Sequence, residues 1–386
     1  MVKRICCIIG TRPEAIKMAP VVLELRRQSW AEVTLLATGQ HRVLLDQALA
    51  GFNLQVDEDL GAMRPGQDLS ALTGHLFHLL GDYLAKSLPD IIIGQGDTTS
   101  AMVAAMCGFY QHIPFAHVEA GLRTGDIDSP FPEELNRRVV ALATSLHFPP
   151  TTAALKNLLA EGVDKGRIVL TGNPVIDALH HVRARLPAQS DAGQQVRMIL
   201  LTTHRRENFG APMHRIFRAV AKLVDTFEDL EVVYPVHPNP AVATLAHDML
   251  GGHPRIHLRQ PMDYPGFIAT LSRCHLVLTD SGGLQEEAPA LGKPVLVLRE
   301  ETERPEAVDC GVAKLVGTEE SAIIKEASRL LEDDAAYASM ALGASPFGDG
   351  QAAIRIVAAV REYLEVEATP YDETQSGADE QMLAFA

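Results

Sequence analysis

Short apolar runs alternate along the chain with longer stretches in which apolar residues recur at helical spacing. The short runs are rich in valine, isoleucine and leucine, which is typical of strands buried in a parallel sheet. A first series of strands is expected at residues 3–9, 32–37, 90–93, 115–118 and 167–170, and a second at 197–201, 230–235, 255–258, 276–278, 294–298 and 313–316. Longer stretches between them, such as 13–28 and 209–227, have helical periodicity. This alternation predicts an α/β protein with parallel sheets and helices on both faces.

The two series of strands indicate two α/β domains that face each other across a cleft. The first series ends at Leu170, and a polar stretch at 187–195 precedes the next strand. We therefore expect one domain over residues 1–172 and a second over 173–349. A last helical pattern at about 350–364 is expected to fold back onto the first domain, and the polar, acidic residues 365–386 are expected to be a disordered tail.

The composition is that of a folded protein whose surface repels polyanions. Of the 386 residues 47% are hydrophobic and 22% are charged, and 34 basic against 49 acidic side chains give a net charge of −15. This charge disfavours nucleic acid and anionic membranes as partners. No apolar stretch approaches the roughly 18 residues of a membrane span, and the apolar core at 5–9 is too short for a signal peptide. The five scattered cysteines lack a CxxC motif, so we expect a reduced, cytoplasmic protein.

The loop after the first predicted strand carries two cations. In GTRPEAIKMAP, Gly10 ends the strand, Pro13 suits the first helical position, and Arg12 and Lys17 bring positive charge to the cleft edge. A helix start with two cations is either an anion site or a solvated helix terminus. The local sequence leaves both interpretations open.

Asp97 lies in GQGDTTSA, between a predicted strand and a predicted helix. Its simplest role is to cap that helix. The GQG segment lacks the GxGxxG spacing, and no acidic residue stands where a dinucleotide-binding unit requires one. We therefore expect no nicotinamide cofactor.

Two further carboxylates follow the next strands. Glu119 comes directly after a strand in HVEAGLRTGD, and Glu133 lies in the first turn of a helix that Pro132 opens. Glu133 and Arg137 are four residues apart, the spacing of a helix-surface ion pair worth about 0.2–0.5 kcal/mol. Asp97, Glu119 and Glu133 nevertheless follow successive strands of one sheet, so we expect them to converge. Clustered carboxylates push their pKa values apart, which gives a site both an acid and a base.

The second half of the chain places basic residues at the ends of its own strands. LLTTHRRENFG puts His204, Arg205 and Arg206 after one strand, and YPVHPNP puts His237 after the next. A lone histidine is more often structural, but this group indicates anion binding or acid–base chemistry. No histidine spacing typical of a metal site occurs, so we expect no metal.

The segment TDSGGLQEEAPALGKPVLVLREETERPE carries the strongest local signal. Ser281 is expected to cap a helix, while Gly282 and Gly283 leave the backbone N–H groups of its first turn bare, which suits a diphosphate. Glu287, one turn further on, can accept the hydroxyls of a ribose, and Arg304 can meet the same anion. Each glycine costs helix stability by about 1 kcal/mol. That cost favours a nucleotide site over an ordinary capped helix.

Together these motifs resemble the non-hydrolysing UDP-N-acetylglucosamine 2-epimerase family. The resemblance runs in order from about residue 3 to 364, through GTRPEAIKMAP, TGQH, GQGDTTSA, HVEAGLRTGD, PFPEELNRR, HRREN, YPVHPNP, TDSGGLQEEAPALGKPVL and TERPEA. It implies a GT-B-like fold of two Rossmann-like domains with a C-terminal helix that crosses back. It also implies a cytoplasmic homodimer that interconverts UDP-N-acetylglucosamine and UDP-N-acetylmannosamine without a cofactor, usually to supply mannosamine units for surface polysaccharides.

The resemblance implies a mechanism in which UDP is eliminated to give a 2-acetamidoglucal and then added back, with C2 protonated on the other face. It implies acid–base roles for Asp97, Glu119 and Glu133 and an important role for His204, but leaves open which carboxylate removes the C2 proton. Phe267 would line the uracil pocket. Substrate contacts are implied for that residue and for Arg12, Lys17, Arg137, Ser281, Gly282, Gly283, Glu287 and Arg304.

Some bacterial members of this family are also activated by UDP-N-acetylglucosamine at a second site. The residues that match this allosteric site are Gln40, His41, Arg205 and His237. Val43 and Gly66 stand where activated members have a glutamine and an arginine. The chain therefore departs from the activated pattern at two positions.

Three other functions fit parts of the pattern. A GT-B glycosyltransferase would share the sheets and the nucleotide helix but would need an acceptor groove. A hydrolysing epimerase would release UDP and free N-acetylmannosamine. A non-catalytic sensor of sugar nucleotides would not need Asp97, Glu119, Glu133 and His204 together.

Overall fold

The computed structural model describes residues 2–39, 42–64, 66–187, 196–342 and 345–366. Two parallel sheets run through it, as predicted. The first has the strand order β3-β2-β1-β4-β5-β6, with bounds β1 (Lys3–Ile9), β2 (Ala31–Ala37), β3 (Glu58–Asp59), β4 (Ile91–Gln95), β5 (Phe115–Val118) and β6 (Leu146–Phe148). The second has the order β12-β11-β10-β7-β8-β9, with bounds β7 (Arg197–Thr202), β8 (Leu230–Pro235), β9 (Ile256–Arg259), β10 (Leu276–Thr279), β11 (Val295–Val297) and β12 (Ala313–Leu315).

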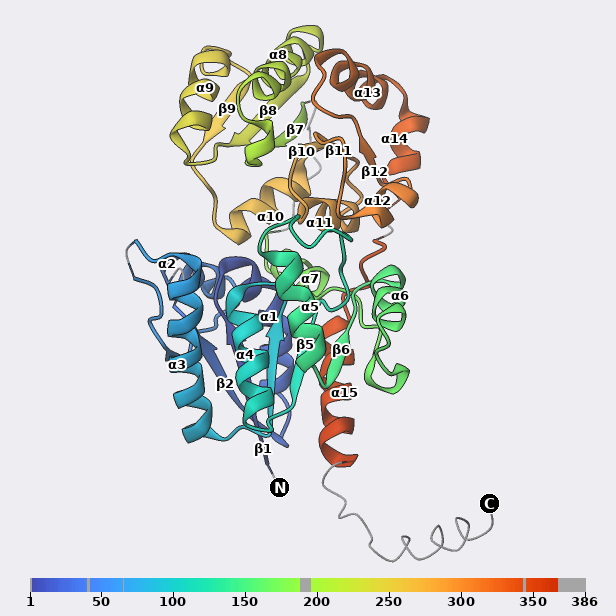
Figure 1. The fold of residues 1–386 in the computed structure, drawn as a ribbon. Helices are drawn as coiled ribbons and strands as arrows, with labels where there is room; N and C mark the ends of the chain where they lie inside the picture. Colours follow the sequence, from blue (N-terminus) through green and yellow to red (C-terminus); the bar gives the residue numbers. More distant parts are fainter. Residues whose placement is uncertain (1, 40–41, 65, 188–195, 343–344, 367–386) are drawn as a thin grey trace, which may run out of the picture.

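Helices surround both sheets (Figure 1). Those before the second sheet are α1 (Arg12–Arg26), α2 (Arg42–Ala50), α3 (Leu69–Ser87), α4 (Thr99–Tyr110), α5 (Glu133–Ala143), α6 (Thr152–Ala160), the 3-10 turn η1 (Lys165–Arg167) and α7 (Pro174–Arg183). Those that follow β7 are η2 (Arg206–Asn208), α8 (Ala211–Thr226), α9 (Pro240–Leu250), α10 (Tyr264–Arg273), α11 (Leu284–Ala290), α12 (Pro305–Asp309), α13 (Glu320–Glu332), α14 (Asp334–Met340) and α15 (Ala352–Val366).

The central strands are buried on both faces, which explains their continuous apolar sequences. In β1, Ile5, Cys7 and Ile9 belong to one hydrophobic cluster, whereas Cys6 and Ile8 belong to another on the opposite face. Adjacent side chains of a strand alternate between faces. The two neighbouring cysteines therefore point away from each other, as the sequence indicated.

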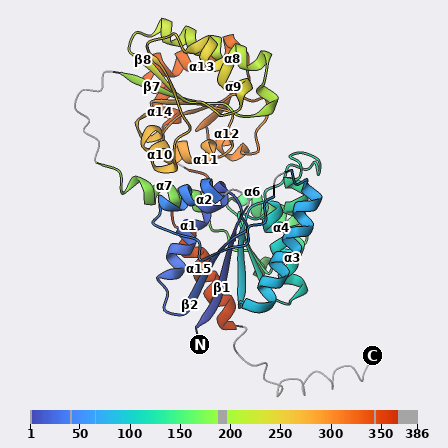
Figure 2. The ribbon, with the colours of Figure 1, turned by 90° about the vertical axis from the view of Figure 1, so that its left-hand side faces the viewer.

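The two sheets lie one above the other, each with its own helices (Figures 1 and 2). This arrangement is the GT-B-like pair of Rossmann-like domains that was predicted. The last helix, α15, returns to contact α1 and α7, and α7 also contacts α10 and α11. The division after residue 172 stays a prediction, because α7 packs against helices of both halves. Residues 367–386 of the predicted tail lie outside the described residues.

The strand expected at 167–170 is not formed. Arg167 ends the short 3-10 turn η1, and only a single parallel bridge joins Ile168 to His147 among the described residues. Leu170 is 44% exposed, so the run does not continue as a buried strand. The edge strand in this place is β6, whose residues Leu146–Phe148 were too few to stand out as a pattern. The two-residue strand β3 was missed for the same reason.

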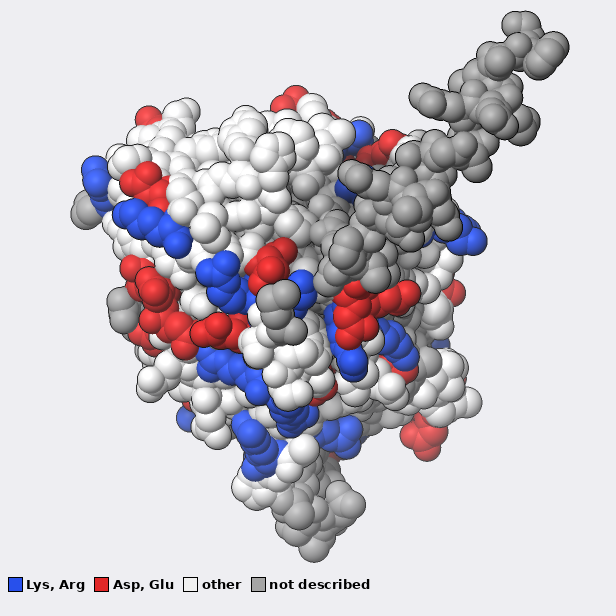
Figure 3. Space-filling model, turned by 90° about the horizontal axis from the view of Figure 1, so that it is seen from below, with Lys and Arg blue, Asp and Glu red and all other residues white. Residues whose placement is uncertain are grey.

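The face seen from below carries acidic and basic side chains next to one another (Figure 3). No continuous basic surface of the kind that binds nucleic acid is visible on this face. Among the residues that the structure describes, no helix is long and apolar enough to cross a membrane.

Candidate functional site

A cavity of about 320 Å³ lies between the two domains, at the carboxyl ends of both sheets. This is where parallel α/β sheets bind ligands. Its walls come from the loops that follow β1, β4, β5, β7, β10 and β11, from the end of β4 and from the first turns of α1 and α5. The lining residues are Thr11, Pro13, Glu14, Lys17, Gln95, Gly96, Asp97, Thr98, Glu119, Leu122, Pro130, Glu133, Arg137, His204, Arg205, Ser281, Gly282, Gly283, Glu303 and Arg304.

Asp97 lies in the turn between β4 and α4 and faces the guanidinium of Arg137. Its Oδ2 accepts hydrogen bonds from Arg137 Nε at 2.8 Å and pairs with Nη2 at 2.7 Å. The expected capping role was wrong, because the N-cap of α4 is Thr98, whose hydroxyl accepts from the Ala101 N–H at 3.1 Å. The Asp97 carboxylate is therefore not needed by the helix and lines the cavity instead.

Glu119 lies at the centre of a buried ring of donors. Lys17 Nζ is 2.7 and 2.6 Å from its two oxygens, Asn173 Nδ2 donates at 3.0 Å, and Gln95 donates from the neighbouring strand. Burial acts to raise the pKa of Glu119, but Lys17 and Arg304 outweigh it, so its pKa lies below the usual value. The carboxylate is thus held ionised.

The backbone at Glu119 is unusual. Its φ is +63°, a left-handed conformation that residues with a side chain seldom adopt and that tends to occur at functional sites. Gly121 follows with φ +85°, and a Cβ at that position would lie 2.3 Å from the carbonyl oxygen of Ala154. Only glycine fits at position 121, which explains the glycine two residues after Glu119.

Glu133 lines the same cavity from the first turn of α5, so the three predicted carboxylates do meet. The suggested ion pair between Glu133 and Arg137 is wrong. Arg137 instead pairs with Asp97 and with Glu134 at 3.2 Å, an i,i+3 contact. The reason is burial: Arg137 and Glu134 both lie on the buried side of α5, where charges must be paired.

The two cations after β1 have different positions. Lys17 lines the cavity and holds Glu119. Arg12 reaches across the domain boundary, where its Nη2 donates to the Met262 carbonyl at 3.3 Å. Arg12 is not among the lining residues named above, so its contact with a substrate stays a prediction.

Arg304 joins the two domains through a buried ion cluster. Its Nε donates to Glu286 on α11, and its Nη2 lies 3.7 Å from Oε1 of Glu119. Asn173 donates to Glu286 at 2.6 Å and to Glu119 as well, so it bridges the same two carboxylates. Although burial opposes its charge, the two carboxylates raise the pKa of Arg304 further above its usual value. The predicted role of Arg304 on a diphosphate is untested.

Gly282 and Gly283 line the cavity, but the predicted cap was wrong. Helix α11 begins at Leu284 with Gly283 as its N-cap, and the Ser281 side chain makes no capping hydrogen bond. Thr279 Oγ1 accepts the N–H of Ser281 at 2.9 Å, which fixes Ser281 in the turn before the helix. Glu286 and Glu287 then occupy the first turn, where carboxylates are favoured.

Glu287 and Phe267 are not among the lining residues named above. Glu287 is 8% exposed, and its Oε1 accepts from the Tyr264 hydroxyl at 2.8 Å. Burial raises the pKa of Glu287 to about 7. Phe267 is half-buried on α10 and packs against the core. Their predicted contacts with ribose and uracil stay predictions.

His204 is oriented by Asp280, a buried residue that the sequence reasoning did not single out. Asp280 accepts the backbone N–H of His204 at 3.0 Å and that of Arg205 at 3.0 Å, and it faces His204 Nδ1 at 3.2 Å. Asn208 donates to it at 3.0 Å. Asp280 follows a strand in TDSGG, just as Asp97 follows a strand in GQGDTT. This similarity could have identified Asp280 as a candidate site residue from the sequence.

Only Arg205 and His237 of the predicted allosteric site lie among the described residues. Gln40 and His41 lie outside the described residues. Arg205 lines the central cavity, where its guanidinium lies beside Gly282 and 3.9 Å from Glu303. The rings of His204 and His237 are stacked with centroids 6.3 Å apart. Activation by substrate therefore stays a prediction.

Other buried groups also escaped sequence reasoning. Glu14 on α1 accepts hydrogen bonds from the N–H groups of Gly10 and Thr11 and from the Thr98 hydroxyl at 2.8 Å. The spacing of Thr11 and Glu14 is that of a capping box, which was a usable signal. Asn173 and Glu286 carried no such signal, because their partners are distant in the sequence and are brought to them by the tertiary fold.

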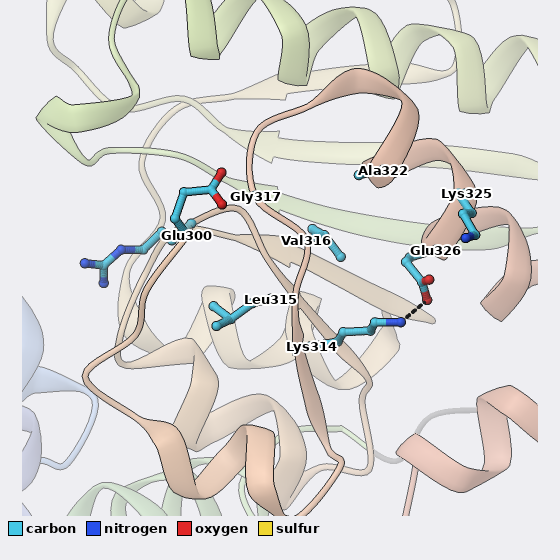
Figure 4. A pocket seen from close by; sticks show the side chains of 9 residues that line it. Glu300, Lys314, Leu315, Val316, Gly317, Ala322, Lys325 and Glu326 are labelled. Carbon is cyan, nitrogen blue, oxygen red and sulfur yellow. Dashed lines mark ion pairs between the residues drawn. The ribbon is translucent and has the colours of Figure 1, made fainter.

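A second cavity of about 330 Å³ lies in the C-terminal domain, beside β12 and α13 (Figure 4). Its Lys314 ammonium pairs with the Glu326 carboxylate at 2.8 Å, and Glu300 lies over Gly317. This cavity brings together none of the candidate site residues. Within the described residues, no group of three or more His, Cys, Asp or Glu side chains is placed to hold a metal ion.

Most of the chain is similar to known sugar-nucleotide epimerases. The profile of the family described as UDP-N-acetylglucosamine 2-epimerase matches residues 23–361. The UDP-N-acetylglucosamine 2-epimerase of Bacillus subtilis (strain 168) is 46% identical over 357 residues, which are 92% of this chain and 94% of the relative. The crystal structure of the UDP-GlcNAc 2-epimerase from Neisseria meningitidis, bound to UDP-GlcNAc, is 41% identical, with a TM-score of 0.87 and coverage of 93% of this chain and 100% of that one.

A more distant structure has the same fold. The UDP-GlcNAc 2-epimerase of Methanocaldococcus jannaschii, in complex with UDP-GlcNAc and UDP, is 29% identical with a TM-score of 0.76, and the match covers 93% of this chain and 99% of that chain. The profile spans most of the residues that line the cavity between the domains, although Thr11, Pro13, Glu14 and Lys17 precede its first matched residue. The motifs, the fold and these similarities agree, and the chain belongs to the UDP-N-acetylglucosamine 2-epimerase family.

Proposed function

We propose that the protein interconverts UDP-N-acetylglucosamine and UDP-N-acetylmannosamine by eliminating UDP and adding it back. The observation that carries this proposal is the convergence of Asp97, Glu119 and Glu133 in one cavity with Arg205 and the paired glycines before α11. Family membership supports the substrate, since relatives have been crystallised with UDP-GlcNAc and UDP.

The diphosphate is proposed to lie against the C-terminal domain. Gly282 and Gly283 have no side chains to block the approach of phosphate oxygens, and the Arg205 guanidinium lies beside Gly282. Arginine suits phosphate because its planar N–H groups form paired hydrogen bonds. Arg304 and Lys17 add positive charge deeper in the cavity. This placement points the sugar toward the carboxylates of the N-terminal domain.

Elimination breaks the C2–H and C1–O bonds and forms an O–H bond on a carboxylate and the C1=C2 double bond. A carboxylate accepts the proton from C2, the electron pair of that C–H bond forms the C1=C2 double bond, and the C1–O bond breaks with its electrons going to UDP. The product is 2-acetamidoglucal, held in the cavity. Addition reverses these steps, except that the proton reaches C2 on the opposite face.

The hydrogen-bond partners of the three carboxylates indicate different roles for them. Glu119 is fixed by Lys17, Asn173 and Gln95, so it is suited to stabilise positive charge that develops at C1 rather than to move. Asp97 and Glu133 have fewer partners, which suits groups that gain and lose a proton. His204, held by Asp280, is proposed to act on the leaving phosphate from the other domain.

Further properties of the family are proposed on the resemblance alone. The protein is proposed to be non-hydrolysing, homodimeric and cytoplasmic, and to supply mannosamine units for surface polysaccharide. The hydrolysing epimerase and the GT-B glycosyltransferase are the alternatives that the experiment must separate.

The proposal is tested by incubating the purified protein with UDP-N-acetylglucosamine in D₂O and following the sugar protons by NMR. UDP-N-acetylmannosamine carrying deuterium at C2, without accumulation of UDP, is the expected result. Accumulation of UDP together with free N-acetylmannosamine would show that the enzyme is a hydrolysing epimerase. No reaction until an acceptor is added would contradict the proposal and favour a glycosyltransferase.

A further inference from the structure

The turn that carries Asp97 is held by side chains that do not themselves line the cavity near C2. The turn runs from Gly96 to Thr98 after β4, and Gly96 has φ +74°. Its N–H donates to the Val118 carbonyl of the neighbouring strand at 3.0 Å. The position of the Asp97 carboxylate therefore depends on what holds the two carbonyl groups of this turn.

The first carbonyl is held by a buried histidine. His117 Nε2 lies 2.7 Å from the Gly96 oxygen, and because a carbonyl can only accept, Nε2 must carry the proton. His117 lies on β5 with only 1% of its surface exposed, two residues before Glu119. Burial lowers the pKa of His117 to about 4, so the ring is neutral near neutral pH and keeps a single tautomer.

The second carbonyl is held from α5. Asn136 Nδ2 donates to the Asp97 carbonyl oxygen at 2.8 Å, and the next residue, Arg137, holds the Asp97 carboxylate. Asn136 is 3% exposed. Thus β5 and α5 each supply one buried side-chain donor to the turn. These donors hold the carbonyl oxygens of two adjacent residues, Gly96 and Asp97.

We propose that His117 and Asn136 are positioning residues that set the place of the Asp97 carboxylate in the cavity. The proposal rests on the acid–base role of Asp97 proposed above. A displacement of about 1 Å can cost a reaction about 100-fold. Without the His117 donor, the buried Gly96 carbonyl has no partner and the turn must shift to find one. Loss of the His117 donor is therefore expected to affect the reaction through the position of Asp97, and this effect can be measured separately from the stability of the fold.

The test compares His117→Leu, which removes the donor at similar volume, with His117→Gln, whose Nε2 has the same reach along the side chain. The matched control is His147→Leu. His147 is also 1% exposed, stands opposite His117 in the register of β5 and β6, and makes no hydrogen bond to residues 96–98 among the described contacts. Asn136→Asp removes the other donor without changing its shape and gives an independent arm if His117→Leu fails to fold.

We expect His117→Leu and Asn136→Asp to lower kcat for C2 exchange by about 10- to 100-fold with KM for the substrate within about threefold. His117→Gln should keep most of kcat, and His147→Leu should keep all of it even if its melting temperature falls. Equal loss in His117→Leu and His117→Gln, or an equal loss in His147→Leu, would overturn the proposal.

A measurement without substrate separates this proposal from the proposed function. Amide hydrogen exchange of the peptide that contains residues 94–100 should be faster in His117→Leu than in the wild type and unchanged in His147→Leu. If the wild type shows no C2 exchange, the proposed function fails, and this readout still decides whether His117 positions the turn. Unchanged protection of that peptide in His117→Leu would overturn the positioning role.

Discussion

Replacing Asp97 with asparagine is expected to slow exchange of the C2 proton by about 10²–10⁴-fold, the range that a positioned acid or base contributes. Asparagine has nearly the same shape but cannot take up a proton. Arg137 keeps its contact with Glu134, so the variant should fold. The affinity for UDP should be unchanged, because Asp97 lies on the N-terminal domain and the proposed diphosphate contacts lie on the other. The measurement is the rate of deuterium uptake at C2, with UDP binding followed by calorimetry.

Asp82→Asn serves as the control for this prediction. Asp82 is an exposed carboxylate on α3, and within the described residues it pairs only with His78, at 3.7 Å. It should leave the exchange rate unchanged. If Asp97→Asn exchanges the C2 proton at the wild-type rate, Asp97 does not transfer this proton, and Glu133 or Glu119 must do so.

Replacing Arg304 with methionine is expected to lower the free energy of unfolding by about 3–5 kcal/mol, because it leaves Glu286 buried without its cation. Glu286 is 1% exposed, and Arg304 itself is 8% exposed. Since Arg304 also lies 3.7 Å from Glu119, the charge balance of the cavity changes as well, and we expect kcat to fall at least tenfold. Denaturant unfolding and steady-state kinetics measure the two effects.

Two further variants make this prediction specific. Arg361→Met breaks an ion pair with Glu365 whose side chains are 57% and 64% exposed, and it should change stability by less than about 1 kcal/mol. Adding Glu286→Leu to Arg304→Met removes the stranded charge and should recover part of the stability but none of the activity. If the single Arg304 variant is as stable as the wild type, the buried cluster does not join the domains as we describe.

The sequence was most informative where a residue follows a strand. Asp97, Glu119 and His204 each come within four residues of the end of an apolar run, and parallel strands bring their carboxyl ends to one edge. The site could therefore be located without a structure. The same rule would have found Asp280, which follows β10 in the same way.

Partners were much harder to predict than positions. The spacing of Glu133 and Arg137 indicated a local pair, but Arg137 pairs with Asp97, 40 residues away, because both line the same cavity. Asn173 and Glu286 are 113 residues apart and meet only because α7 packs against α11. No local pattern contains that information.

Short elements were predicted least well. The three residues of β6 and the seven of α11 are too few for periodicity to show, so the sheet edge was placed at 167–170 and the cap at Ser281. In both cases contacts outside the segment determine its structure. His147 of β6 pairs with β5, and the Thr279 hydroxyl accepts the Ser281 N–H and holds Ser281 ahead of the helix.

The most direct test of the mechanism follows the oxygen that joins C1 to the β-phosphorus. UDP-N-acetylglucosamine labelled with ¹⁸O at this bridge is incubated with the enzyme to equilibrium and examined by ³¹P NMR. Elimination frees the β-phosphate, whose oxygens become equivalent when it rotates, so we predict that ¹⁸O moves into non-bridging positions as UDP-N-acetylmannosamine forms. Complete epimerisation with all of the ¹⁸O still at the bridge would contradict elimination and re-addition of a UDP whose β-phosphate rotates in the cavity.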